Sequence, residues 1–159
     1  KRTSEREIQK FVQRHYWILG LEYVGARPQQ LASSKNRIDL LAQRVDESFD
    51  IVELKKPNEA LFKKRGKRTT ITTSLKDAII QIIDYIDFYV EQRGYTLTAE
   101  DLDIYKPRGI IVIGRTIEEE QKQIRKITFY LHNILIVTYD DLLSKARGAL
   151  KVLGAKRLR

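Results

Sequence analysis

With 159 residues, 42% of them hydrophobic, the chain is long enough for one folded domain and too apolar for a disordered segment. It has no cysteine, no apolar run of membrane-spanning length and no signal peptide, which excludes disulfides, thiolate zinc sites and membrane helices and favours the cytoplasm. The net charge of +9 is concentrated in residues 55–68 and 145–159, each carrying +6, which favours a polyanionic partner such as nucleic acid. Because the first residue is not Met, we expect 1–159 to be a single domain from a longer protein.

Helical and strand periods alternate along the first third of the chain. Residues 4–16 predict an amphipathic helix, and residues 21–31 predict an irregular segment that can include a strand. Residues 37–44 and 49–55 predict two strands joined by a short turn. We therefore expect an antiparallel hairpin directly after the first helix and the irregular segment.

The middle of the chain begins with a segment rich in lysine and arginine. Residues 56–73 predict a loop, and Ser74 is the expected N-cap of a long helix over 74–93. Residues 94–106 predict a polar connection, and the apolar run 109–113 predicts a buried strand.

The last third predicts two more helices around one more strand. Thr116 and Glu119 form a capping-box pattern that opens a helix ending near residue 132. A buried strand follows over 134–138, and Asp140 is the expected cap of a helix that ends near residue 154. The order of elements predicts an α/β domain with a mixed central sheet, an antiparallel hairpin and flanking helices.

The predicted hairpin carries two acidic residues that matter for chemistry. Asp39 and Glu53 would lie directly opposite one another, on one face of the sheet, in an antiparallel register centred on Asp46. Two facing carboxylates repel unless they share a proton or bind a metal ion. Lys55 follows Glu53 by two residues, so its side chain points to the same side of the strand.

Two carboxylates and one ammonium that converge on one point suit a Mg²⁺ site with a water-activating lysine, the chemistry of phosphodiester hydrolysis. A simple ion pair between Glu53 and Lys55 is the alternative interpretation of the same pattern.

Two helices can add polar groups to this site. Gln81 and Tyr85 lie one turn apart on the margin of an apolar stripe, where they could reach a cleft or simply form an amphipathic edge. Glu5 lies about 60° from the centre of the first helix's apolar stripe, where a carboxylate needs a metal or a cationic partner. Favourable interaction with the helix dipole is the alternative for Glu5.

The basic segment next to the hairpin predicts a DNA-binding loop, with a solvated surface loop as the alternative. The candidate DNA-binding residues are Lys56, Lys63, Lys64, Arg65, Lys67 and Arg68.

Several segments resemble a known nuclease superfamily. The motifs are Asn36-Arg37-Ile38-Asp39-Leu40-Leu41, Ile51-Val52-Glu53-Leu54-Lys55-Lys56-Pro57 and Gln81-x-x-x-Tyr85. Together they resemble the PD-(D/E)xK nucleases, although Ile38 replaces the proline of the superfamily name. The segments 5–11, 107–115 and 138–143 narrow the resemblance to the nuclease domain of Shedu-type antiphage defence proteins, from Glu5 to about Leu153.

The resemblance implies a restriction-endonuclease-like core that acts on DNA. Asp39 and Glu53 would hold Mg²⁺, for which Mn²⁺ could substitute, and Lys55 would position or activate the attacking water. Gln81 and Tyr85 would support the site, and Glu5 would be the upstream acidic residue. The resemblance also implies a homo-oligomer, either a dimer or a tetramer.

We therefore expect a Mg²⁺-dependent DNA endonuclease of bacterial antiphage defence. The alternatives are a non-catalytic nucleic-acid-binding or scaffold module with the same fold, and a restriction or repair nuclease, which the catalytic residues do not distinguish from a defence nuclease.

Overall fold

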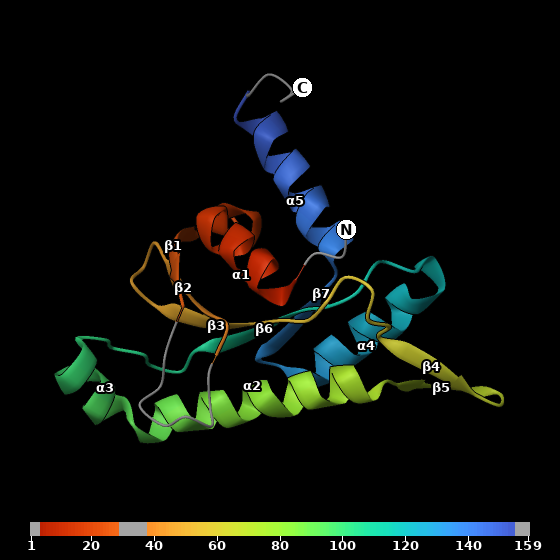
Figure 1. Ribbon diagram of the computed structural model, residues 1–159, viewed down its shortest axis with the longest axis horizontal. Helices are drawn as coiled ribbons and strands as arrows, with labels where there is room; N and C mark the ends of the chain where they lie inside the picture. Colours follow the sequence, from red (N-terminus) through yellow and green to blue (C-terminus); the bar gives the residue numbers. More distant parts are fainter. Residues whose placement is uncertain (1–3, 29–37, 155–159) are drawn as a thin grey trace.

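The computed structural model describes residues 4–28 and 38–154, and a mixed five-stranded sheet lies at its centre (Figure 1). In spatial order the strands are β1 (Tyr23–Arg27), β2 (Leu40–Arg44), β3 (Phe49–Leu54), β6 (Arg108–Val112) and β7 (Ile134–Val137). The pairs β1–β2 and β2–β3 are antiparallel, and the pairs β3–β6 and β6–β7 are parallel. The predicted mixed sheet with an antiparallel hairpin is confirmed.

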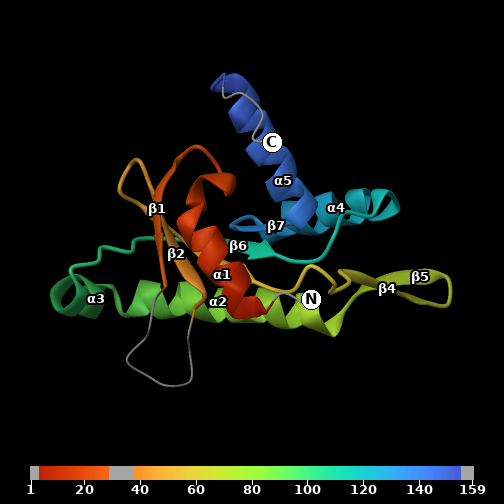
Figure 2. The same cartoon turned by 45° about the horizontal axis from the view of Figure 1, so that its top comes forward.

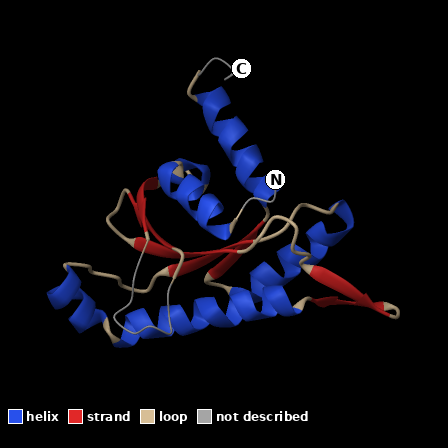
Figure 3. Cartoon of the chain, viewed as in Figure 1, coloured by secondary structure: helices blue, strands red, loops and turns tan. Residues whose placement is uncertain are grey.

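Helices cover both faces of the sheet, as Figures 2 and 3 show from two directions. One face packs against α2 (Thr73–Glu91) and α4 (Gln121–Leu131), and the other against α1 (Glu5–Arg14) and α5 (Tyr139–Val152). The shorter helices are η1 (Tyr16–Ile18), α3 (Arg93–Glu100) and η2 (Glu118–Glu120). None of the described helices is long and apolar enough to cross a membrane.

The central strand β3 shows why both faces must be covered. All six of its residues are buried, with Ile51 in the core beneath α2 and Val52 in the core beneath α1 and α5. A strand that is covered on both faces is apolar at nearly every position, and not only at every second one. Asp50 and Glu53 are the exceptions, and each has cationic partners.

Two segments that were predicted to lack secondary structure form regular elements. Within the predicted loop 56–73, β4 (Phe62–Arg65) and β5 (Arg68–Ile71) form an antiparallel hairpin that turns at Gly66, where φ is +58°. The sequence shows no alternation of apolar and polar residues here, because only Phe62 of β4 is buried and the other side chains of that strand are charged. Helix α3 begins at Arg93 and occupies the first half of the predicted connection 94–106.

Three predicted helix caps are wrong by two or more residues. Thr72, not Ser74, caps α2, and Thr138 rather than Asp140 caps α5 through a capping box. Thr116 caps no helix, because the chain first forms η2 and its hydroxyl instead contacts that of Thr138. Residues 29–31, Asn36 and Arg37 lie outside the described residues, so the predictions for them stay predictions.

Helix α2 approaches the sheet closely over β6. A Cβ atom added at Gly109 would overlap the side chain of Ile82, which is fully buried in α2. The lack of a side chain at this position therefore allows the helix to lie close to the sheet.

We predict that Gly109→Val destabilises the fold by about 1–3 kcal/mol, because an inserted side chain in a close-packed core forces its neighbours apart. Urea unfolding followed by circular dichroism measures the change. Gly148→Ala is the control: it lies in α5 with no atom within 4 Å of the added Cβ, and should stabilise the helix. Equal stability of wild type and Gly109→Val would contradict the close approach.

Candidate active site

Strands β2 and β3 bring the two acidic residues together at one end of the sheet. Leu40 pairs with Val52, and this register continued by one residue sets Asp39 opposite Glu53, which confirms the predicted register. Because Ile51 faces α2, Glu53 faces the same helix two residues further along.

Both carboxylates are held from several directions. Asp39 Oδ2 accepts a hydrogen bond of 2.8 Å from the main-chain N–H of Leu54, and Gln9 Nε2 donates to the Asp39 carbonyl oxygen over 2.6 Å. The side chain of Glu53 is buried. Burial, and then the charge of Asp39, raise the pKa of Glu53 to about 7, against an opposing effect of Lys55. The pair thus resists full ionisation and is a strong attractant for a cation.

Lys55 points to the same side of β3 as Glu53, as predicted. Its Nζ lies 2.8 Å from Glu53 Oε1 and donates to Gln81 Oε1 over 2.8 Å. Burial alone would lower the pKa of Lys55, but the hydrogen bond to Glu53 and the charges of Glu53 and Asp39 raise it. Lys55 is therefore an ammonium donor at neutral pH.

Helix α2 supplies the two predicted supporting residues. Gln81 contacts Lys55 directly, and Tyr85 is buried one turn further along. Burial and the charges of Glu53 and Asp39 raise the pKa of Tyr85 to about 12, so its phenol keeps its proton beside them. Both residues therefore lie at the site, and they do more than form the edge of an amphipathic helix.

Glu5 lies at the rim and not toward the core. Its exposed carboxylate is 3.4 Å from Lys56 Nζ, so Glu5 has a cationic partner at the surface. Glu5 is still near enough to raise the pKa values of Glu53 and Tyr139 through its charge. Lys56, predicted to bind DNA, is thus paired with a carboxylate.

Two residues that were not predicted from the sequence support the site through its main chain. Tyr139 donates its hydroxyl to the Lys55 carbonyl oxygen over 2.6 Å, and Gln9 holds Asp39 in the same way. Burial, then the charges of Asp39, Glu59 and Glu5, raise the pKa of Tyr139. The only signal was the position of Tyr139 directly after a buried strand that ends at the same sheet edge.

The remaining predicted DNA-binding residues lie on the β4–β5 hairpin. The hairpin projects from the N-terminal end of α2, away from the sheet (Figures 1 and 2). All five of its basic side chains are exposed: Lys63, Lys64, Arg65, Lys67 and Arg68. They lie on a regular hairpin rather than on the loop that was predicted for residues 56–73.

Comparison with known proteins assigns a family. The model of the family described as Shedu protein SduA, C-terminal, matches residues 2–143. The chain belongs to this family. Among solved structures, the Shedu domain is similar to the one titled "Structure of EndoMS-dsDNA2 complex", with a TM-score of 0.48 and 16% identity. That match covers 85% of this chain and 44% of the other, so this chain spans less than half of that length. No curated protein matches.

We predict that Glu53→Gln gains stability relative to wild type as the pH rises. The pKa of Glu53 is raised from 4.5 to about 7 by folding, so its contribution to stability is fully present below pH 4.5 and is lost as the pH rises through 7. Because glutamine does not titrate, the difference in free energy of unfolding should grow across this window and then level off. Urea unfolding at a series of pH values tests it, and a difference independent of pH would contradict the raised pKa.

Proposed function

We propose that this Shedu-family domain is a Mg²⁺-dependent DNA endonuclease of bacterial antiphage defence, with Mn²⁺ able to substitute. The observation that carries the proposal is the convergence of Asp39, Glu53 and Lys55 beneath α2, with Lys55 Nζ 2.8 Å from both Glu53 and Gln81. Family membership supports the role in defence, and the exposed cationic hairpin supports DNA as the substrate.

The donor set fits a hard divalent cation. No group of three or more His, Cys, Asp or Glu side chains within residues 4–28 and 38–154 is arranged to hold a metal ion. Mg²⁺ does not require one, because it keeps several waters and is bound through one or two carboxylates together with substrate phosphates. Asp39 and Glu53 supply two carboxylates. Burial, and then the charge of Asp39, raise the pKa of Glu53, and a bound cation would offset both effects.

Each protein group then has a distinct task. When bound, Mg²⁺ supplies Lewis-acid polarisation of a phosphoryl oxygen and lowers the pKa of a ligated water. Lys55, kept as an ammonium, donates hydrogen bonds toward the attacking water and the charge that develops on the phosphate. Gln81 restricts the position of the Lys55 ammonium, and the protonated hydroxyl of Tyr85 is a donor at the same face.

We predict that the wild-type chain cleaves linear and supercoiled DNA only with Mg²⁺ or Mn²⁺, and that Lys55→Ala cleaves at least about a hundredfold more slowly, as expected when a charge-stabilising donor is removed. Gel assays of both DNA forms provide the measurement. Lys76→Ala, which removes an exposed lysine of α2, is the matched control and should cleave like wild type. Equal cleavage by wild type and Lys55→Ala would refute the catalytic assignment.

A thermal melt separates the nuclease from a non-catalytic binding module. Mg²⁺ should raise the melting temperature of wild type but not of Asp39→Asn, because binding to the native state alone stabilises it. No shift in wild type, together with full DNA affinity, would favour the scaffold.

We predict that the tip of the hairpin contacts phosphates. Replacing Arg65 and Lys67 together with Ala should reduce the slope of log Kd against log salt by roughly two, since each phosphate contact contributes about 0.9. Fluorescence anisotropy over a salt series measures the slope. Arg147→Ala with Lys151→Ala removes the same charge from α5 and should leave the slope nearly unchanged. Equal effects of the two pairs would mean that only the overall charge attracts DNA.

A further inference from the structure

An exposed arginine, Arg115, lies on the loop that follows β6, at the edge of the sheet where Lys55 lies. The parallel pairing of β3 with β6 continues past the ends of both strands. The Lys55 N–H donates to the Val112 carbonyl oxygen over 2.8 Å, and the Gly114 N–H donates to the Lys56 carbonyl oxygen over 3.2 Å. Because neighbouring strands lie about 4.8 Å apart, Arg115 leaves the sheet only one strand away from Lys55 and Lys56.

The loop that carries Arg115 is held in place by neighbouring segments. Gly114 has a φ of +62°, and a Cβ atom there would overlap the main-chain oxygen of Glu59, so this turn requires glycine. The Tyr139 N–H donates to the Gly114 carbonyl oxygen over 3.1 Å. The Thr116 N–H donates to Asp140 Oδ2 over 2.8 Å. The main chain is therefore fixed on both sides of Arg115.

Asp140, at the start of α5, orients the guanidinium of Arg115. Its carboxylate accepts hydrogen bonds from Arg115 Nε over 2.8 Å and from Nη2 over 2.7 Å. These bonds use two of the five N–H donors of an arginine, and no described residue accepts a hydrogen bond from Nη1. The free donors include one on Nη1 and one on Nη2 that point the same way, an arrangement that binds a phosphate through two parallel hydrogen bonds. The Arg115 side chain is 62% exposed, so a ligand can reach them from solvent.

The opposite edge of the sheet is less suited to a polyanion. A surface depression near the start of β3 includes Phe49 among its lining residues and has Arg27 as a cation. The acidic side chains that line it are Asp46, Glu47, Asp101 and Asp103. This concentration of negative charge favours the approach of DNA at the edge that carries Arg115.

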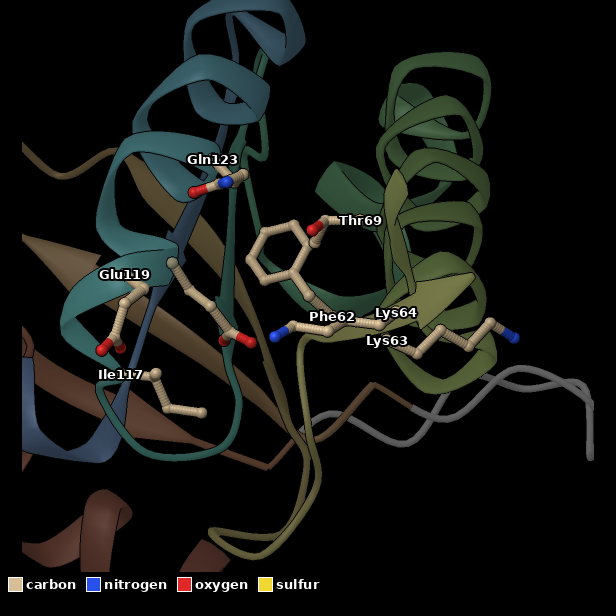
Figure 4. Close-up of a pocket in the computed structure, with 8 residues that line it drawn as sticks. Phe62, Lys63, Lys64, Thr69, Ile117, Glu119 and Gln123 are labelled. Carbon is tan, nitrogen blue, oxygen red and sulfur yellow. The ribbon is translucent and has the colours of Figure 1, made fainter. Parts of the chain in front are cut away.

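The loop after Arg115 also faces the basic hairpin. Ile117 and Glu119 form one wall of a cavity of about 410 Å³, and Lys63 and Lys64 of β4 lie on the other (Figure 4). The three carboxylates of η2 begin three residues after Arg115, so net positive charge alone does not favour a phosphate at this loop. The oriented guanidinium adds directed hydrogen bonds, which net charge does not supply.

We propose that Arg115 binds a DNA phosphate next to the one that is cleaved, through the donors that Asp140 leaves free, with Asp140 as a positioning residue. The proposal rests on the proposed function, since it takes DNA as the substrate and Lys55 as the group at the cleaved phosphate. A second phosphate held one strand away would fix how the DNA backbone lies across the edge of the sheet.

Binding of a labelled duplex without metal ions tests this contact independently of cleavage. In fluorescence anisotropy over a salt series, Arg115→Gln should reduce the slope of log Kd against log salt by about 0.9, the contribution of one phosphate contact. Arg93→Gln is the matched control and should keep the slope, because Arg93 is an exposed arginine that pairs with Asp103 through the same two nitrogens, at the acidic depression. A wild-type slope in Arg115→Gln, or equal reductions in both variants, overturns the proposal.

A variant that keeps the charge tests the role of Asp140. Arg115→Lys has no planar fork for Asp140 to orient, so it should keep the slope but bind DNA about tenfold more weakly, as for the loss of one hydrogen bond to a charged group. Wild-type affinity in Arg115→Lys would overturn the positioning role of Asp140.

Cleavage assays with Mg²⁺ separate this proposal from the proposed function. A reduced slope in Arg115→Gln, without metal-dependent cleavage by wild type, would mean that only the nuclease assignment fails. Metal-dependent cleavage by wild type, with an unchanged slope in Arg115→Gln, would mean that only the Arg115 contact fails.

Discussion

The central strand β3 carries two carboxylates into a region where every residue is buried, and the rest of the structure depends on how each is matched. Asp50, fully buried, accepts hydrogen bonds from Tyr23 over 2.6 Å and from Arg108 over 2.7 Å. Glu53, at the other end, has Lys55 as its cation and Asp39 as a repelling neighbour. Asp50 is satisfied by donors within the protein, whereas Glu53, next to Asp39, keeps a raised pKa in spite of Lys55. A carboxyl group perturbed in this way marks a candidate site.

The two helical layers support different parts of this site. Helix α2, held close to the sheet at Gly109, places Gln81 and Tyr85 on the face that carries the charges. From the opposite layer, Tyr139 of α5 binds the carbonyl of Lys55 and Gln9 of α1 binds the carbonyl of Asp39. One layer therefore contacts the charged side chains of the candidate site, while the other binds the main chain that carries them. Such a division restricts the geometry of Lys55 from both sides of the sheet.

The β4–β5 hairpin is a separate two-stranded unit that projects away from the central sheet and carries exposed basic side chains. Exposed positive charge on β4 and β5 offers affinity for a phosphate backbone without sequence preference.

The sequence by itself determined the features that follow from local geometry. The period of two along β3 brought Glu53 and Lys55 to one side, and the length of the turn set Asp39 opposite Glu53. Only the tertiary structure decided which distant residues complete the site: Tyr139 is 84 positions from Lys55, and no local pattern connects them. It also decided that Glu5 pairs at the surface, since a helical wheel describes directions around one axis and not what lies beside it. Local periods are set by backbone geometry, whereas these contacts arise when separate layers pack on one sheet.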